Sequence, residues 1–236
     1  MSGAQTKTVA GTGCWSCQAP SAGEHFCPAC GKIQPLPGDT DYFGFFGLPK
    51  KLEIDSAELE KRFHQLSWKL HPDNFVRATS YERDLSLDRS SQLNDAYRTL
   101  RDPISRVEYL LWQAGMRKEG ETRQEAPPEL LEEVFELNEA LDELRLPREA
   151  GGSPGERAAL EERLSAAQKS FERKLSEADA ELEAVFHEWD AAVDAGAGEP
   201  ERKPLMARMN EILNCRSYVR NLVSNVRKVL AEARAL

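Results

Sequence analysis

The chain has 236 residues, of which 30% are charged and 8% are aromatic, and its formal net charge at pH 7 is −9. This balance argues against a large β-sandwich or β-barrel, and the acidic excess disfavours broad electrostatic binding to nucleic acid or to anionic membranes, which requires clustered lysine and arginine. No apolar run approaches the ~20 residues that a membrane-spanning helix needs.

Four of the five cysteines lie within 17 residues of each other and form two Cys-x-x-Cys pairs: Cys14, Cys17, Cys27 and Cys30. Four closely spaced thiolates suit tetrahedral Zn²⁺, and Gly31 after the second pair relieves the tight turn. We therefore predict a structural zinc site in a small knuckle that folds as a module separate from the helices. The alternative is a redox-active dithiol, which would not need two matched pairs. His25 is expected to be a bystander, since four sulfurs already complete the coordination shell.

Residues 39–103 predict two amphipathic helices separated by a turn. In the first helix, apolar residues recur at i, i+4, i+7 and i+11 over residues 59–70, and Ser56 is a suitable N-cap. The tripeptide His71-Pro72-Asp73, called the HPD loop below, ends this helix because proline disfavours helical geometry in the preceding residue. The second helix is expected over residues 80–100, so that an antiparallel hairpin displays the HPD loop at its tip.

Residues 104–236 predict three longer helices with apolar stripes at helical spacing. The first begins near Glu129, the second covers roughly 156–194, and the third carries its stripe over residues 205–229. Alternation of β-branched residues is absent throughout. The predicted fold class is therefore all-α, with a helical hairpin, a C-terminal three-helix bundle and the small zinc knuckle in front.

Several motifs of the middle segment together resemble a J domain. These motifs are Asp41-Tyr42-Phe43, Phe46-Gly47-Leu48-Pro49, the HPD loop that follows a helix, and the run from Leu93 to Leu100. More narrowly, the chain is similar to the HscB family of co-chaperones, whose C-terminal domain fits residues 106–111 and 136–144, and which includes a form with a preceding tetracysteine element. The resemblance covers residues 14–145 well and the last helix more loosely. One departure is Asn74, where many J domains have lysine.

This resemblance implies three parts: residues 1–38 as the zinc element and linker, 39–115 as the J domain, and 116–236 as the scaffold-binding bundle. It implies a co-chaperone of iron–sulfur cluster assembly that stimulates a DnaK/HscA-type ATPase chaperone through the HPD loop and delivers an IscU-type scaffold protein to it. Basic side chains on the preceding helix are expected to steer the chaperone: Lys61, Arg62 and Lys69. The sequence contains no phosphate loop, HExxH motif or dinucleotide fingerprint, so we expect no enzymatic activity of its own.

Two large apolar side chains near the start of the bundle lie off its core stripe. At 100° per residue, Leu131 points about 100° and Phe135 about 140° away from the stripe centre. They either pack against the loops between helices or form a partner-binding patch with an acidic rim. In HscB-like proteins this face, with an aromatic residue of the last helix, binds the cluster scaffold, and the matching positions are Leu131, Phe135, Glu136, Glu139 and Tyr218.

Two other functions remain open from the sequence: a general J-domain co-chaperone for unfolded clients, and a zinc-dependent thiol oxidoreductase. The absence of a Gly/Phe-rich linker and of β-rich client domains argues against the first. We expect a monomer without nucleic-acid or membrane partners, located in the cytoplasm. The alternative location is the mitochondrial matrix after presequence removal, although the first 13 residues contain no arginine and no amphipathic repeat.

Cys215 falls on the apolar stripe of the last helix and is expected to be a buried, inert thiol.

Overall fold

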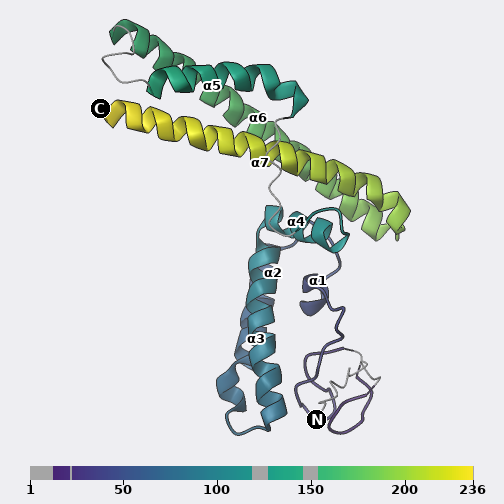
Figure 1. Cartoon of the computed structure of the whole chain (residues 1–236). Coiled ribbons are helices and arrows are strands. Elements are labelled where there is room, and N and C mark those ends of the chain that lie inside the picture. Colours follow the sequence, from purple (N-terminus) through teal and green to yellow (C-terminus); the bar gives the residue numbers. More distant parts are fainter. Residues whose placement is uncertain (1–12, 22, 119–126, 146–153, 236) are drawn as a thin grey trace, which may run out of the picture. The chain divides into compact units, whose positions relative to one another are not determined.

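The computed structural model describes residues 13–21, 23–118, 127–145 and 154–235, and every regular element of this part is helical (Figure 1). The helices are α1 (Tyr42–Phe45), α2 (Ser56–Leu70), α3 (Ser80–Arg101), α4 (Pro103–Gln113), α5 (Leu131–Arg145), α6 (Pro154–Asp194) and α7 (Glu199–Ala235). Short 3-10 turns cover Pro72–Phe75 and Pro128–Leu130. The predicted all-α class is confirmed, and none of the described helices has the length and apolar character to span a membrane.

The chain divides into two compact units, Met1–Arg106 and Val107–Leu236. The segment that carries the four clustered cysteines, called the tetracysteine element below, therefore belongs to the same unit as the hairpin of α2 and α3. The sequence-based division into three parts, at residues 38/39 and 115/116, stays a prediction. Each unit is described separately below.

The α2–α3 hairpin follows the predicted pattern, with a small difference at its first cap. Asp55, not Ser56, is the N-cap of α2, and its carboxylate accepts hydrogen bonds from the amides of Ala57 at 2.9 Å and Glu58 at 3.2 Å. Both residue types cap helices well, so the pattern alone places the cap only to within one residue. Helix α3 begins with a capping box in which Thr79 and Glu82 bond each other's backbone amides.

A buried arginine closes the core of the first unit. The guanidinium of Arg106, only 4% exposed, donates from Nε to the carbonyl of Leu100 at 2.7 Å and from Nη1 to the carbonyl of Leu52. It thus ties the end of α3 to the segment before α2. The core of this unit also contains buried apolar side chains from α1, α2, α3 and the segment before α2: Phe43, Leu52, Leu59, Leu70, Leu93, Ala96 and Leu100.

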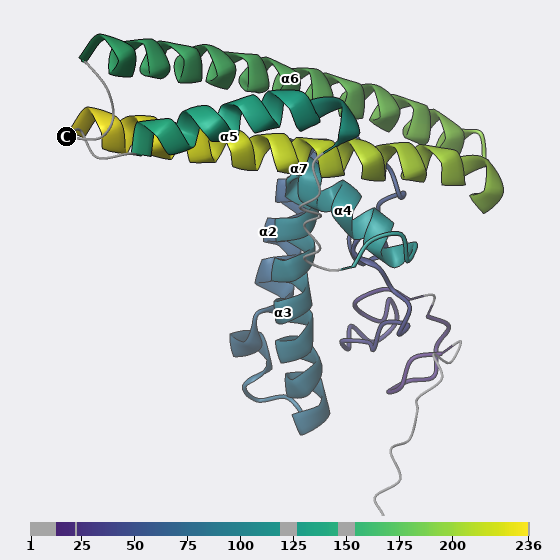
Figure 2. The ribbon, with the colours of Figure 1, turned by 45° about the horizontal axis from the view of Figure 1, so that its top comes forward.

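The second unit is built on the long antiparallel pair α6 and α7, with α5 lying along one half of it (Figure 2). Helix α5 packs on the N-terminal half of α6 and the C-terminal half of α7 through a buried apolar cluster. Its members include Leu137, Leu141, Leu164, Phe171, Val219 and Val226. Ion pairs join α6 to α7 at the surface, for example Arg227 with Glu172 at 2.6 Å. The predicted three-helix bundle is present.

Replacing Arg106 by methionine should destabilise the first unit. The change leaves the buried carbonyls of Leu100 and Leu52 without this donor, and each such loss costs about 1–3 kcal/mol. We expect the free energy of unfolding to fall by about 2–5 kcal/mol, measured by urea denaturation, with hydrogen exchange assigning the loss to residues 1–106. Arg98→Met is the matched control: this arginine is exposed on α3, and its loss should change stability by about 0.5 kcal/mol or less. Equal effects of the two substitutions would contradict the structural role of Arg106.

Candidate functional site

The two Cys-x-x-Cys pairs form two hooks with the same backbone geometry. In the first hook, the amide of Cys14 donates to the carbonyl of Ala19 at 2.8 Å, and the amide of Gln18 donates to the carbonyl of Cys14 at 2.9 Å. The second hook repeats both bonds around Cys27, at 2.8 and 2.9 Å. The residue after each hook has a left-handed backbone, with φ of +60° at Gln18 and +71° at Gly31. This turn directs the two sulfurs of each hook toward the same point.

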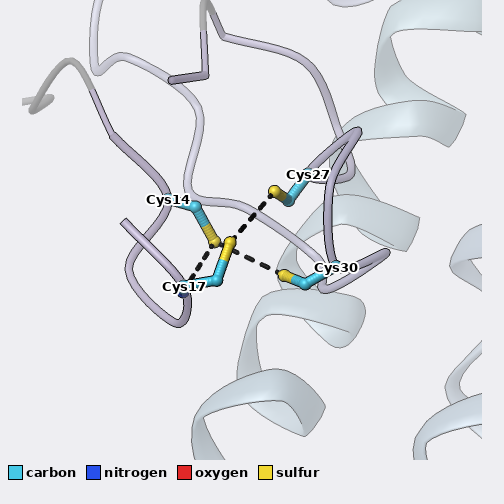
Figure 3. Close-up of side chains that lie close together, drawn as sticks. All are labelled: Cys14, Cys17, Cys27 and Cys30. Carbon is cyan, nitrogen blue, oxygen red and sulfur yellow. Dashed lines mark hydrogen bonds between the residues drawn. The ribbon is translucent and has the colours of Figure 1, made fainter. Parts of the chain in front are cut away.

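The four sulfurs meet between the hooks (Figure 3). All four Sγ atoms lie within 4.8 Å of one another, and two pairs, Cys14 with Cys30 and Cys17 with Cys27, are each 3.7 Å apart. In a regular tetrahedron with Zn–S bonds of about 2.3 Å, neighbouring sulfurs are about 3.8 Å apart. The donor set therefore fits one tetrahedral metal ion in both chemistry and size, and the predicted clustering of the four cysteines is confirmed.

The thiols of this cluster differ in acidity. Burial opposes ionisation of Cys14, but hydrogen bonds from the amides of Cys17 and Ser16 outweigh it and hold the pKa of Cys14 at about 6. The amide hydrogen bond from Lys32 favours the Cys30 thiolate, but burial and the three neighbouring sulfurs raise its pKa to about 12. A cation among the sulfurs removes the repulsion that keeps four thiolates from forming together.

The tetracysteine element packs against α3, and its predicted independence as a folding module stays a prediction. The indole of Trp15 donates to the carbonyl of Ile33 at 2.6 Å and meets the ring of Tyr81 edge to face, with centroids 5.1 Å apart. The ammonium group of Lys32 lies 2.7 Å from the carboxylate of Glu82, which is 3% exposed. Because Glu82 also belongs to the capping box of α3, the element is attached to the first turn of that helix.

His25 attaches the element to α1. Its Nε2 donates to the carbonyl of Phe45 at 2.8 Å, and the two rings meet edge to face with centroids 4.6 Å apart. Burial, together with the nearby charge of Arg89, lowers the pKa of His25 below its ordinary value, so the ring is neutral near pH 7. Its role in the structure is packing, and it lies outside the four-sulfur cluster.

The HPD loop is held in place by hydrogen bonds to its backbone. The last carbonyl of α2, that of Leu70, accepts from Ser86 at 2.7 Å and from Ser90 at 3.0 Å, both on α3. The amide of Asp73 donates to Nδ1 of His71 at 3.2 Å. The side chains of His71 and Asp73 are 56% and 86% exposed. A fixed backbone thus presents two exposed polar groups between α2 and α3.

Asn74, the departure from the J-domain pattern, has a structural role. Its side-chain amide donates to the carbonyl of Trp68 at 2.6 Å, and this bond caps the C-terminal end of α2. A lysine at this position would supply charge toward a partner, whereas asparagine here fixes the turn that follows the helix.

The three predicted basic residues of α2 have different surroundings. Lys61 is exposed and lies 3.4 Å from Glu58. Arg62 bonds the same carboxylate at 2.9 Å and donates to the carbonyl of Phe46 at 2.9 Å, so its guanidinium is fixed. Lys69 is exposed and makes no ion pair within the described residues. Their predicted role in steering a partner stays a prediction.

Two exposed apolar residues beside the HPD loop were missed at the sequence level. Trp68 on α2 is 77% exposed and Val76 after the loop is 67% exposed. Trp68 lies off the apolar stripe of residues 59–70, and this is the signal that could have identified it.

The acidic face of α5 has the exposure that a binding patch requires. Leu131 is 55% and Phe135 is 65% exposed, and the neighbouring Glu136 and Glu139 are exposed as well. Exposed side chains of this size do not contribute to the bundle core, which favours the partner-binding interpretation over packing. The predicted aromatic residue of the last helix, Tyr218, is only partly exposed and packs against the core.

Cys215 lies one turn before Tyr218 on α7. It is half-buried, and burial raises its pKa, with a further contribution from the carboxylate of Glu129. Cys215 therefore remains a neutral thiol near pH 7.

Comparison with known proteins identifies relatives over most of the chain, although no family model matches it. A co-chaperone protein HscB homolog of Vibrio vulnificus is 36% identical over 156 residues, which are 65% of this chain and 85% of the relative. The human iron–sulfur cluster co-chaperone protein HscB is 33% identical over 167 residues, or 69% of this chain and 68% of the human protein. The crystal structure of human HscB superimposes with a TM-score of 0.56 at 27% identity, covering 92% of this chain and 97% of that one. This chain therefore belongs to the HscB family of co-chaperones.

Proposed function

We propose that the chain is a non-enzymatic co-chaperone of iron–sulfur cluster assembly that couples an IscU-type scaffold protein to a DnaK/HscA-type ATPase chaperone. The observation that carries this proposal is the HPD loop, held rigidly at the tip of the α2–α3 hairpin with His71 and Asp73 exposed. In J domains this loop stimulates the chaperone's ATPase, and the chemistry of ATP hydrolysis belongs to the partner. The relatives named for iron–sulfur cluster assembly support the same role.

The surroundings of the HPD loop suit recognition of a protein surface. Its backbone is already ordered by Ser86, Ser90 and Asn74, so binding requires little further loss of conformational entropy. The exposed cation Lys69 and the exposed indole of Trp68 precede the loop on α2. Charged groups of this kind increase the rate of association, and a desolvated tryptophan contributes to affinity.

The face of α5 is the proposed scaffold-binding surface. Leu131 and Phe135 supply apolar anchors, and Glu136 and Glu139 supply an acidic rim. An adaptor with separate sites for client and chaperone raises the effective concentration of one for the other, so capture of the client by the chaperone becomes nearly intramolecular.

The proposed ion of the tetracysteine element is Zn²⁺ in a structural role. The four cysteines satisfy a tetrahedral shell completely, which leaves no open position for a substrate. When bound, the ion supplies folding energy to a segment that has few apolar contacts of its own. The packing of Trp15 and Lys32 on α3 transmits that stabilisation to the hairpin.

His71→Gln and Asp73→Asn should each abolish stimulation of the chaperone's ATPase and leave helicity and scaffold binding unchanged, because both side chains are exposed and support no core contact. Single-turnover ATP hydrolysis by a DnaK/HscA-type chaperone is the measurement. His64→Gln is the control, since His64 is an exposed histidine on α2, the helix that precedes the HPD loop. Full stimulation by either HPD variant would refute the assignment of a J domain.

The double variant Leu131→Ala and Phe135→Ala should weaken binding of the scaffold by well over tenfold, because buried apolar anchors are each worth about 2 kcal/mol or more at an interface. The thermal stability of the bundle should change little, since both side chains are exposed. Calorimetry with an IscU-type scaffold measures the affinity. Leu87→Ala, an exposed leucine on α3, serves as the control. A variant that melts early but binds normally would place these side chains in the core.

The purified protein should contain one zinc ion per chain, and Cys27→Ser should lose it while Cys215→Ser retains it. Removing the ion by chelation should increase hydrogen exchange in residues 13–35 and in the first turn of α3, because Lys32 then releases Glu82. Residues 107–236 should be unaffected. A protein without metal, with Cys14 and Cys17 oxidised to a disulfide, would support a redox function instead.

A further inference from the structure

The four cysteines of the tetracysteine element differ in their access to solvent. Cys14 and Cys27 are each 2% exposed, whereas Cys17 and Cys30 are exposed. Each hook therefore has a buried first cysteine and an exposed second cysteine. The proposed Zn²⁺ binds cysteine as the thiolate. An accessible thiolate beside a second thiolate is the arrangement in which cysteine reacts with oxidants.

Two sulfur–sulfur contacts connect the hooks to each other (Figure 3). The Sγ atom of Cys14 lies 3.7 Å from that of Cys30, and the Sγ atom of Cys17 lies 3.7 Å from that of Cys27. Each contact pairs an exposed cysteine with a buried one of the other hook. A disulfide bond is about 2.0 Å long, so each pair has to approach by about 1.7 Å to form one. The buried cysteine of each pair is thus positioned to resolve oxidation of the exposed one.

We propose that the tetracysteine element is a reversible oxidation site for hydroperoxides. Oxidation converts the four cysteines into two disulfides that join the hooks, Cys17 with Cys27 and Cys14 with Cys30, and these bonds keep the element closed when the ion leaves. The inference rests on the proposed zinc ion, and it does not depend on the proposed contacts with the chaperone or the scaffold.

The reaction of each pair has two steps. The exposed thiolate attacks one oxygen of the hydroperoxide, so that an S–O bond forms, the O–O bond breaks, and alkoxide or hydroxide leaves. The buried thiolate then attacks the sulfur of the resulting sulfenic acid, so that the S–S bond forms and hydroxide leaves. Two thiolates thus lose two electrons, and one hydroperoxide gains them. After both pairs have reacted, no thiolate ligand remains and the ion is released.

Disulfides between the hooks preserve the attachment of the element to α3. Lys32 and Trp15 lie beside the hooks, and they make the ion pair with Glu82 at 2.7 Å and the ring contact with Tyr81. Two covalent bonds across the element hold both residues near α3 in place of the ion. Disulfides within each hook would instead leave no bond between the two halves of the element.

Disulfide mapping is the first test. The zinc-loaded protein is treated with hydrogen peroxide, the remaining thiols are alkylated, and the peptides are analysed by mass spectrometry. We expect disulfides of Cys17 with Cys27 and of Cys14 with Cys30, and release of zinc to a chromogenic chelator in step with their formation. A dithiol reductant with added Zn²⁺ should restore the thiols and the bound ion. Cys215, a half-buried neutral thiol in the other unit, is the internal control and should stay reduced.

Hydrogen exchange in the first turn of α3 is the second test. In the oxidised protein, the amides of Thr79 and Glu82 should exchange within about twofold of their rate in the zinc-loaded protein. Chelation of zinc from the reduced protein should accelerate the same amides by about tenfold or more, because the reduced element then opens. Lys32→Met is the reference for a first turn without the ion pair, and its amides should exchange faster than wild type in both the zinc-loaded and the oxidised state.

The outcomes separate this inference from the earlier proposals. If the reduced protein binds no zinc, the proposed ion is wrong and the inference falls with it. If the reduced protein binds zinc, but peroxide produces disulfides within the hooks or only sulfinic acids, the oxidation site alone is overturned. Cross-hook disulfides with exchange in α3 as fast as after chelation would overturn the closed oxidised state. ATPase stimulation by the untreated protein is measured in parallel, so a failure of the proposed co-chaperone function is seen separately.

Discussion

The buried carboxylate of Glu82 joins three parts of the first unit. It accepts hydrogen bonds from the backbone and hydroxyl of Thr79, which start α3, and it lies 2.7 Å from the ammonium group of Lys32 in the tetracysteine element. The bond from Lys32, followed by those from Thr79, holds the pKa of Glu82 below its ordinary value. Folding thus favours the ionised form, so the stabilisation is complete at neutral pH and is lost as the pH falls through the native pKa.

Glu82 lies close in sequence to the HPD loop, on which the proposed function depends. Glu82 is in the first turn of α3, directly after the segment that contains the HPD loop, and Ser86 one turn later bonds the end of α2. The metal element, the cap of α3 and the turn between the helices are therefore linked through adjacent turns of one helix. A protein that must present two exposed side chains in a fixed geometry benefits from such support, because each fixed bond reduces the conformations that binding has to exclude.

Local sequence patterns predicted the parts of the structure that local interactions determine. The apolar spacing of residues 59–70 gave the first helix of the hairpin, and the off-stripe positions of Leu131 and Phe135 agree with their exposure. The spacing of the four cysteines predicted their convergence, since two short hooks leave few other arrangements. In each case the relevant residues lie within a few turns of one another.

Contacts between distant residues were not accessible in this way. The pairing of Lys32 with Glu82 joins positions 50 residues apart, and no periodicity marks either residue as a partner of the other. The same holds for Arg106, whose buried bond to Leu52 gives an arginine a core position that composition would assign to the surface. Asn74 stands out in the sequence only as a departure from the lysine of many J domains, whereas in the structure its side-chain amide caps α2. The roles of Lys32, Arg106 and Asn74 depend on which backbone and side-chain groups folding brings near them, and a local sequence pattern does not show this.

The left-handed backbone after each cysteine hook makes the two halves of the metal site unequal. Gly31 adopts this conformation without steric cost, whereas at Gln18, with φ of +60°, the Cβ atom clashes with the backbone at a cost of about 1–2 kcal/mol. The hook of Cys27 and Cys30 therefore closes without this steric cost, whereas closure of the hook of Cys14 and Cys17 has to offset it, in part through the packing of Trp15 on Tyr81. On this difference in strain, we expect the hook of Cys14 and Cys17 to open before the hook of Cys27 and Cys30 when a bound ion is withdrawn.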